Sequence, residues 1–309
     1  MKFYNNIISF LFFVIMFSTC FSQNSSYCPE QMLLIQKYKS KNYVNASQYI
    51  DTVLTQCPDK SNDAYFLHLC GFINFNIYRE IDGKSSSSSA RPAACDYFVK
   101  SINYDNKNQF TEKNLQAINS FSISYINDAL MIMQKMEFKN QSKALEYYNT
   151  FKMLKSIAEP NYDFSNISID FFNGMGRMYK MRYENDKINS KNLLDSCINY
   201  FNKSLAINTN QYTPNYDLGI LYHNLGVDII LEELDIDADL EMVILMQEQA
   251  VDYFSKSLPY LEKVYQMKPQ ETSIVQGIAA VYYSLNDMEK HVEYMNILKG
   301  LESKSSGDK

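Results

Sequence analysis

The sequence predicts an all-α protein, an α-solenoid of about six helical hairpins. Gly and Pro are scarce, 9 and 7 among 309 residues, which suits long helices better than a loop-rich or all-β chain. Apolar residues make up 46% of the chain and recur at helical spacing. The stretch from Ser257 to Leu301 sets the register, because a helix closed by Pro269 is followed by two more helices joined by a short turn.

Residues 1–22 have the pattern of a secretory signal peptide. Lys2 supplies a positive start, and Ile7 to Phe17 form an apolar run too short for a permanent membrane anchor. We expect cleavage before Gln23, which leaves no stable transmembrane anchor. The alternative is lipidation of Cys20, although the residues before it make a poor lipobox. Either way we expect an exported protein that is periplasmic, outer-membrane-associated or secreted.

After the signal peptide, one repeat domain is expected over residues 23–302, followed by a polar and disordered tail over 303–309. Helical spacing divides the domain into six hairpins with inserted loops. The expected hairpins lie at about 28–58, 62–105, 111–156, 168–208, 213–268 and 271–301.

Several local features refine these hairpins. Asp63 is expected to cap the first helix of the second hairpin, and the serine run Ser85–Ser89 to form a solvated, mobile loop. The second helix of the fifth hairpin is overlong and should be kinked at Pro259. The register within the first helix of the third hairpin stays open, because no pair of small and aromatic residues lies at the expected positions.

The last hairpins carry small and aromatic residues in a recurring order, which lets two helices approach closely while rings fill the gaps. The clearest positions are Phe172, Met175, Gly176 and Tyr179, then Leu218, Gly219, Tyr222, Leu225 and Gly226. This pattern resembles the tetratricopeptide repeat (TPR) family, and in particular exported TPR proteins of Gram-negative bacteria. The resemblance covers nearly all of the mature chain. It implies a right-handed superhelix whose first helices line a concave surface.

The same resemblance implies a non-enzymatic scaffold that binds another protein or a peptide. The residues placed on the concave surface are Asn173, Arg177, Lys180, Tyr216, Ile220, His223, Gln276 and Tyr283. One alternative is a structural subunit of a cell-envelope or secretion assembly. A weaker alternative is an envelope lipoprotein that captures carbohydrate or peptide, which would require a lipidated Cys20.

No pattern indicates catalysis, a cofactor or a metal. The three histidines lie far apart in the sequence, and no HExxH or GxSxG motif occurs. The acidic run Asp235–Glu241 begins like a calcium-binding EF-hand loop, but Leu240 and Met246 replace the required Gly and Glu. A turn ending in a helix cap is the competing interpretation. With a net charge of −6 and no clustered basic face, nucleic acid is not an expected partner.

Five cysteines remain after signal cleavage. Cys28 precedes the first helix of the first hairpin and Cys57 ends the second, so an antiparallel arrangement brings them together and favours a disulfide. Cys70 and Cys95 lie at facing depths of the second hairpin and form a second candidate pair. Cys197 is expected to be a buried free thiol. The alternative is five buried thiols.

Overall fold

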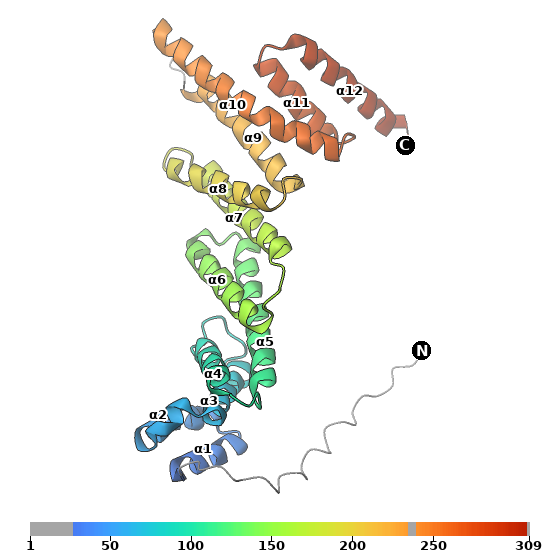
Figure 1. Cartoon of the computed structure of the whole chain (residues 1–309). Coiled ribbons are helices and arrows are strands. Elements are labelled where there is room, and N and C mark those ends of the chain that lie inside the picture. Colours follow the sequence, from blue (N-terminus) through green and yellow to red (C-terminus); the bar gives the residue numbers. More distant parts are fainter. Residues whose placement is uncertain (1–26, 234–238, 308–309) are drawn as a thin grey trace. The chain divides into compact units, whose positions relative to one another are not determined.

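The computed structural model describes residues 27–233 and 239–307, and every regular element within these ranges is helical. The all-α class is thus confirmed for the described part of the chain, and its helices follow one another in pairs (Figure 1). The expected signal peptide and part of the acidic run Asp235–Glu241 lie outside the described residues. Within the described ranges, no helix has both the length and the hydropathy needed to cross a membrane.

The chain divides into two compact units, with unit 1 ending at Asn114 and unit 2 beginning at Leu115. In unit 1, two helix pairs pack as hairpins, and two short helical turns follow the second and third helices. These elements are α1 (Pro29–Lys39), α2 (Tyr43–Gln56), η1 (Pro58–Asn62), α3 (Ala64–Asn76), η2 (Ile77–Ile81) and α4 (Ala90–Tyr104).

The boundary between the units falls inside α5 (Thr111–Gln134). The remaining elements of unit 2 are η3 (Phe138–Asn140), α6 (Gln141–Ala158), α7 (Ser165–Asn185), α8 (Lys191–Ile207), α9 (Tyr212–Asp228), η4 (Ile229–Glu233), α10 (Leu240–Met267), α11 (Thr272–Ser284) and α12 (Met288–Gly307). Helices α7 and α8, α9 and α10, and α11 and α12 pack as three successive hairpins.

Helix starts follow local side-chain chemistry. The Asp63 carboxylate accepts a hydrogen bond from the Phe66 backbone N–H at 2.9 Å, so the expected cap of α3 is confirmed. Asp239 caps α10 in the same way through the Met242 N–H at 2.8 Å. Since Asp239 belongs to the acidic run, this contact supports the cap interpretation of that run over the calcium interpretation.

Close approach within the hairpins depends on glycine facing an aromatic ring. A Cβ atom on Gly71 would lie 2.5 Å from the Phe98 ring, and one on Gly176 would lie 2.7 Å from the Phe201 ring. Both rings are fully buried. The small–aromatic pairing read from the sequence at Gly176 and Phe201 therefore sets the spacing of α7 and α8.

Two expectations about local structure need correction. The serine run is not a solvated loop throughout, because Ser88 is buried and donates from its Oγ to Asp82 Oδ2 at 2.5 Å. The tail expected to be disordered from residue 303 continues α12 as far as Gly307, since extending an existing helix carries no nucleation cost. Pro259 lies inside α10, which spans Leu240–Met267, and the kink expected there stays a prediction.

The cysteines divide into one bonded pair and three free thiols. Cys28 and Cys57 form a disulfide at a sequence separation of 29, in the first hairpin as expected. Cys70 and Cys95 are free, so the second candidate pair is wrong. Cys70 belongs to the core cluster of the first hairpin, and Tyr97 of α4 packs against this cluster. Cys95 precedes Tyr97 by two residues and therefore lies roughly 200° around α4, on a side that faces away from Cys70. Cys197 is buried and free, as expected.

Candidate functional site

The eight residues expected on the concave surface all lie in unit 2, on the first helices of three successive hairpins. Helix α7 carries Asn173, Arg177 and Lys180, α9 carries Tyr216, Ile220 and His223, and α11 carries Gln276 and Tyr283. Only Arg177, Gln276 and Tyr283 are exposed, and the other five are half-buried. The structure therefore leaves a smaller free surface on these helices than the sequence suggested.

The two cations of the expected surface, Arg177 and Lys180, both pair with one carboxylate that the sequence did not indicate. Asp217 on α9 is buried and accepts from Arg177 Nε at 3.1 Å and from Lys180 Nζ at 2.8 Å. Lys180 is itself mostly buried, whereas half of the Arg177 side chain is exposed. Both cations thus link α7 to α9, and only Arg177 keeps exposed donors. A lone acid within the apolar stretch of α9 was the signal that could have revealed this link.

The three α9 residues are mainly packing residues. Tyr216 stacks on Tyr212 with ring centroids 5.7 Å apart, and Ile220 packs against the core of the last two hairpins. The His223 ring lies 5.6 Å from the Phe254 ring, and burial lowers its pKa, which favours the neutral form. A substrate or peptide would find little of these side chains to contact.

Of the two ends of the expected surface, the one formed by Tyr283 on α11 is accessible. Tyr283 is 62% exposed, and its ring lies 5.3 Å from that of His291. His291 in turn bonds through Nδ1 to the Ala279 carbonyl oxygen at 2.9 Å, which joins α11 to α12. On α7, Asn173 Oδ1 is buried and has no hydrogen-bond partner among the described residues.

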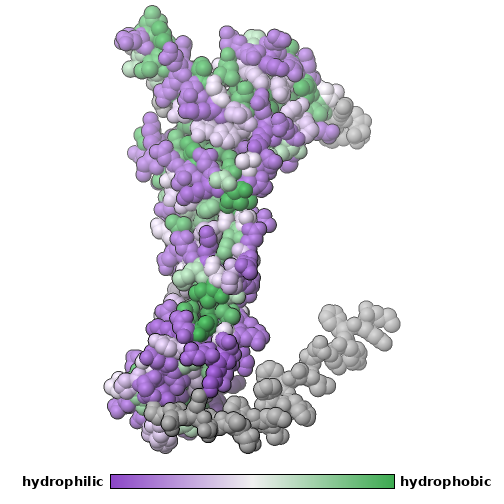
Figure 2. All heavy atoms as spheres, in the orientation of Figure 1, coloured by the Kyte–Doolittle hydropathy of each residue, from purple (hydrophilic) through white to green (hydrophobic). Residues whose placement is uncertain are grey.

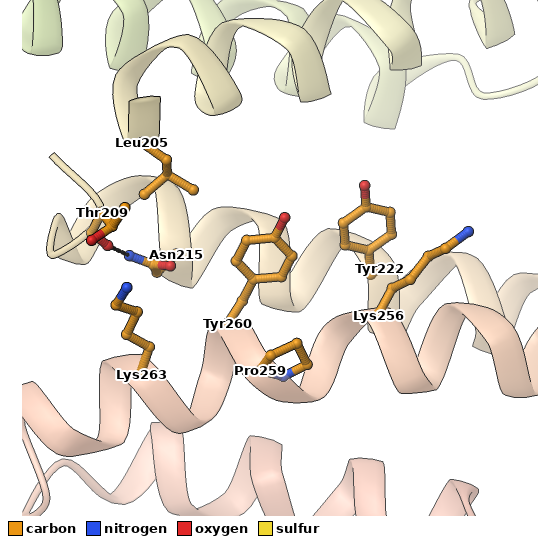
Figure 3. Close-up of a pocket in the computed structure, with 8 residues that line it drawn as sticks. All are labelled: Leu205, Thr209, Asn215, Tyr222, Lys256, Pro259, Tyr260 and Lys263. Atoms are coloured by element: carbon orange, nitrogen blue, oxygen red, sulfur yellow. Dashed lines mark hydrogen bonds between the residues drawn. The ribbon is translucent and has the colours of Figure 1, made fainter. Parts of the chain in front are cut away.

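A groove of about 590 Å³ opens on a different side of α9 (Figure 3). Its walls come from the end of α8, the turn after it, α9 and the middle of α10. In Figure 3 the side chains of Tyr222, Tyr260 and Lys263 point toward the opening below Leu205. The complete lining is Leu205, Thr209, Asn215, Tyr222, Lys256, Pro259, Tyr260 and Lys263.

The groove and the expected surface use neighbouring positions in the sequence. Asn215 and Tyr222 line the groove, whereas Tyr216 and His223 were assigned to the concave surface. Because each residue turns an α-helix by roughly 100°, adjacent positions face different sides. The groove therefore opens on another side of α9 than the residues assigned to the concave surface, whose role in binding stays a prediction.

Stacked tyrosines form the floor of the groove. The Tyr222 ring lies 5.9 Å from that of Tyr260 and 6.3 Å from that of Tyr253, both nearly parallel. Burial, together with the neighbouring tyrosines, raises the pKa of Tyr222 to about 12, and burial also raises the pKa of Tyr260. Both phenols thus remain protonated near neutral pH and can donate hydrogen bonds.

Two lysines flank Tyr260 on α10. Lys256 pairs with Asp252 at 2.6 Å, in an exposed contact that a ligand can compete with. Lys263 has no ion-pair partner within the described ranges. On the opposite wall, Asn215 Nδ2 donates to the Thr209 and Gln211 carbonyl oxygens and so fixes the turn after α8. The groove therefore combines ring faces, hydroxyl donors and positive charge.

Unit 1 has a smaller cleft of about 180 Å³ between α1 and α3, lined by Ile35, Tyr38, Lys39, Tyr65, His68, Leu69 and Phe72. His68 Nδ1 bonds to Asn114 Oδ1 at 2.7 Å. Burial lowers the pKa of His68, outweighing the opposing effect of the Asn114 contact. With its imidazole held in this contact and its ring 4.8 Å from those of Phe72 and Phe110, His68 is placed for packing.

One group in the described chain has the composition of a metal site, namely Cys28, Glu30 and Cys57. Its two sulfur atoms are bonded to each other, so neither can act as a thiolate ligand. The chemistry available to this group is therefore redox exchange of the disulfide rather than metal coordination.

No protein-family model matches the chain, and no curated protein matches it. Among solved structures, the chain is similar to a crystal structure of MamA protein, at 16% identity and a TM-score of 0.32. The similarity covers 76% of this chain and 94% of that one.

Proposed function

We propose that this protein is an exported, non-catalytic scaffold that binds another protein. Its groove would hold an extended acidic segment of that partner. The groove between α8, α9 and α10 is the observation that supports the proposal most strongly. Its volume of about 590 Å³ lies within the range of ligand-binding clefts. Ring faces and phenol hydroxyls suit a peptide backbone, and the lysines favour carboxylate side chains.

The spacing of the lysines specifies the ligand further. Lys256 and Lys263 are separated by seven positions of one helix, which places them roughly 10 Å apart along its axis. An extended peptide in the polyproline II conformation advances about 3.1 Å per residue with three residues per turn. Carboxylates three residues apart then lie on the same side of the peptide and would reach both lysines, with the peptide between them over Tyr260.

Export is supported by two separate features. The first 22 residues have the signal-peptide pattern described above, and unit 1 contains the Cys28–Cys57 disulfide. Disulfides persist in the periplasm and outside the cell, whereas cytosolic thiols are kept reduced. The intact mass of the secreted protein tests this part: a mature chain beginning at Gln23 supports a cleaved signal peptide and excludes a Cys20 lipid anchor.

The groove can be tested without knowing the natural partner. Random peptides displayed on phage are selected on the purified protein, and an enriched sequence is synthesised and titrated. We expect Asp or Glu at positions three apart, and we expect Lys263→Glu to weaken binding roughly tenfold. Lys299→Glu, an exposed lysine on α12, is the matched control and should leave affinity unchanged.

Two other results would contradict the groove assignment. Enriched peptides without acidic residues would remove the role of the lysines. Loss of binding in Arg177→Ala and Tyr283→Ala, with Lys263→Glu unaffected, would instead place the ligand on the exposed first-helix residues.

A structural subunit of an envelope or secretion assembly is the second candidate function. It is favoured by the large side chains exposed on α10, because broad apolar surface is typical of assembly contacts. In that case, chemical cross-linking in intact envelopes should capture a stable complex that survives Lys263→Glu.

A further inference from the structure

The first half of α10 exposes far more apolar surface than a soluble helix needs. Leu240 is 74% exposed, Leu245 is 58% exposed, and Met242, Ile244 and Val251 are each nearly half exposed. Figure 2 shows strongly hydrophobic residues gathered at the end of unit 2 where Figure 1 places the free end of α10. A contiguous group of this kind marks a contact surface more often than chance exposure does.

The helix turns only one narrow side toward the rest of unit 2. Ala250 is buried, and Val243 and Met246 on the same side are half-buried. The remaining sides face solvent, so the exposed leucines and isoleucine are not part of the core. They contribute nothing to the packing of the fifth hairpin.

The exposed side chains are ordered around the helix. At roughly 100° per residue, Leu240, Ile244 and Val251 form one apolar stripe, and Met242 and Leu245 form a second. The ridge between the two stripes is acidic and consists of Glu241, Glu248 and Asp252. We call residues 240–252 the acidic–apolar face.

The surroundings in sequence strengthen the negative charge. Between Lys203 and Lys256 no Lys or Arg occurs, and every formally charged side chain is Asp or Glu. Among the described residues of the face, only Asp252 pairs with a cation, Lys256, which lies one turn further along α10. The face therefore presents apolar area together with uncompensated acids.

We propose that the acidic–apolar face docks a cationic amphipathic helix of another protein. Apolar side chains of such a helix would cover the stripes, while its Lys or Arg residues would meet the acidic ridge. An anionic membrane would be repelled by the ridge. A second copy of this chain would bring acids against acids. Charge complementarity thus selects the cationic helix.

This surface differs from the groove in charge, and the variants proposed for each leave the Asp252–Lys256 pair, at which the two meet, unchanged. The groove carries lysines and suits an acidic segment, whereas the acidic–apolar face suits a basic one. The two sites can therefore be tested with probes of opposite charge, and failure of one leaves the other untouched.

The test uses a synthetic helix of about 18 residues with Leu on one face and Lys on the other, long enough to be helical when bound. Its labelled form is titrated with the full-length mature protein by fluorescence anisotropy. We expect saturable binding, and no binding by the same peptide with Glu in place of Lys.

Variants separate docking from simple charge attraction. The triple change Leu240→Gln, Ile244→Gln and Leu245→Gln leaves all acids in place and should weaken binding at least about tenfold. Glu241→Gln with Glu248→Gln should weaken binding and reduce its salt dependence.

The matched control replaces exposed apolar residues of α5 and α6 in unit 2, namely Ile123, Met131 and Met153, each by Gln. It should bind like the unaltered protein, and circular dichroism checks that all variants keep their helix content.

Three outcomes would overturn the proposal. Unchanged affinity in the triple variant would show attraction by charge alone. A dimer in sedimentation equilibrium that the triple variant abolishes would assign the face to a second copy of the chain. Binding of the protein to phosphatidylcholine vesicles, lost in the same variant, would assign it to a lipid surface.

Discussion

The two units achieve cohesion by different chemistry. In unit 1 a disulfide closes the first hairpin, and a buried chain of hydrogen bonds runs from Asn114 through Ser101 to the Ala64 carbonyl oxygen, with distances of 2.9 and 2.8 Å. Unit 2 also has buried hydrogen bonds, such as that from Ser257 Oγ to the Gly219 carbonyl oxygen at 2.7 Å, but it adds ion pairs that join successive hairpins. Asp217 joins α7 to α9, and Lys187 reaches Asp228 at 2.7 Å. Tyr179 stacks on Tyr200, and Tyr282 on Tyr294.

This difference predicts different sensitivities. A disulfide depends on the redox environment and is a feature of unit 1, whereas each unit has a half-buried histidine of lowered pKa, His68 and His223, that makes its stability depend on pH. Half-exposed ion pairs depend on the identity of one carboxylate and, more weakly, on salt. The two units should therefore lose stability under different treatments, which hydrogen exchange read by mass spectrometry can follow separately for each.

The largest expected effect is the loss of the disulfide. Cys57→Ser should lower the free energy of unfolding of unit 1 by about 2–4 kcal/mol, because the unfolded chain regains freedom. Hydrogen exchange should accelerate in α1 and α2 and stay unchanged in α7 to α12. A reducing agent should mimic the variant in the unaltered protein and add nothing to the variant itself. Equal acceleration in both units would contradict the comparison.

The next effect concerns the α7–α9 link in unit 2. Asp217→Asn leaves the largely buried Lys180 without its carboxylate and should cost about 2–3 kcal/mol, reduced from the value for a fully buried pair because Arg177 is half exposed. Exchange in α7 and α9 reports the loss. Asp252→Asn, which breaks an exposed pair, is the matched control and should cost less than about 0.5 kcal/mol.

The smallest effect is the pH dependence of unit 1. Burial holds the pKa of His68 below the ordinary histidine value of about 6.5, so the unfolded chain binds a proton more readily than the folded one. The stability that His68 contributes is present above pH 6.5 and is lost as the pH falls through the lower folded pKa. Denaturant midpoints of unit 1 measured from pH 7.5 to 5 should fall, and His68→Gln should flatten that fall. An unchanged slope in the variant would assign the pH dependence to other groups.

Much of the fold could be predicted from the sequence because its signals are local. The Asp63 cap acts within one turn, and the small–aromatic pairing of Gly176 with Phe201 belongs to a single hairpin. The pairing of Cys28 with Cys57 needed only that two consecutive helices run antiparallel. The predicted pairing of Cys70 with Cys95 failed because it depended on rotation about a helix axis, which changes by roughly 100° with each residue.

The candidate site was harder to predict for the same reason. The repeat pattern placed Arg177 and Tyr283 on helices where the structure leaves them exposed, but it did not indicate the side of α9 on which a groove opens. Asp217 was overlooked since its partners lie 40 and 37 residues earlier in the chain. Whether a cation is available to a ligand depends on such distant partners.

The sequence by itself determined the all-helical class, the order of the hairpins and the first disulfide, because helical periodicity, caps and close approach are properties of neighbouring residues. Only the tertiary structure decided which surfaces are free. It assigned Lys180 to a link between helices, opened a groove beside Tyr260 and left the acidic–apolar face of α10 uncovered. Exposure results from all the elements that pack around a side chain, and no local pattern contains that information.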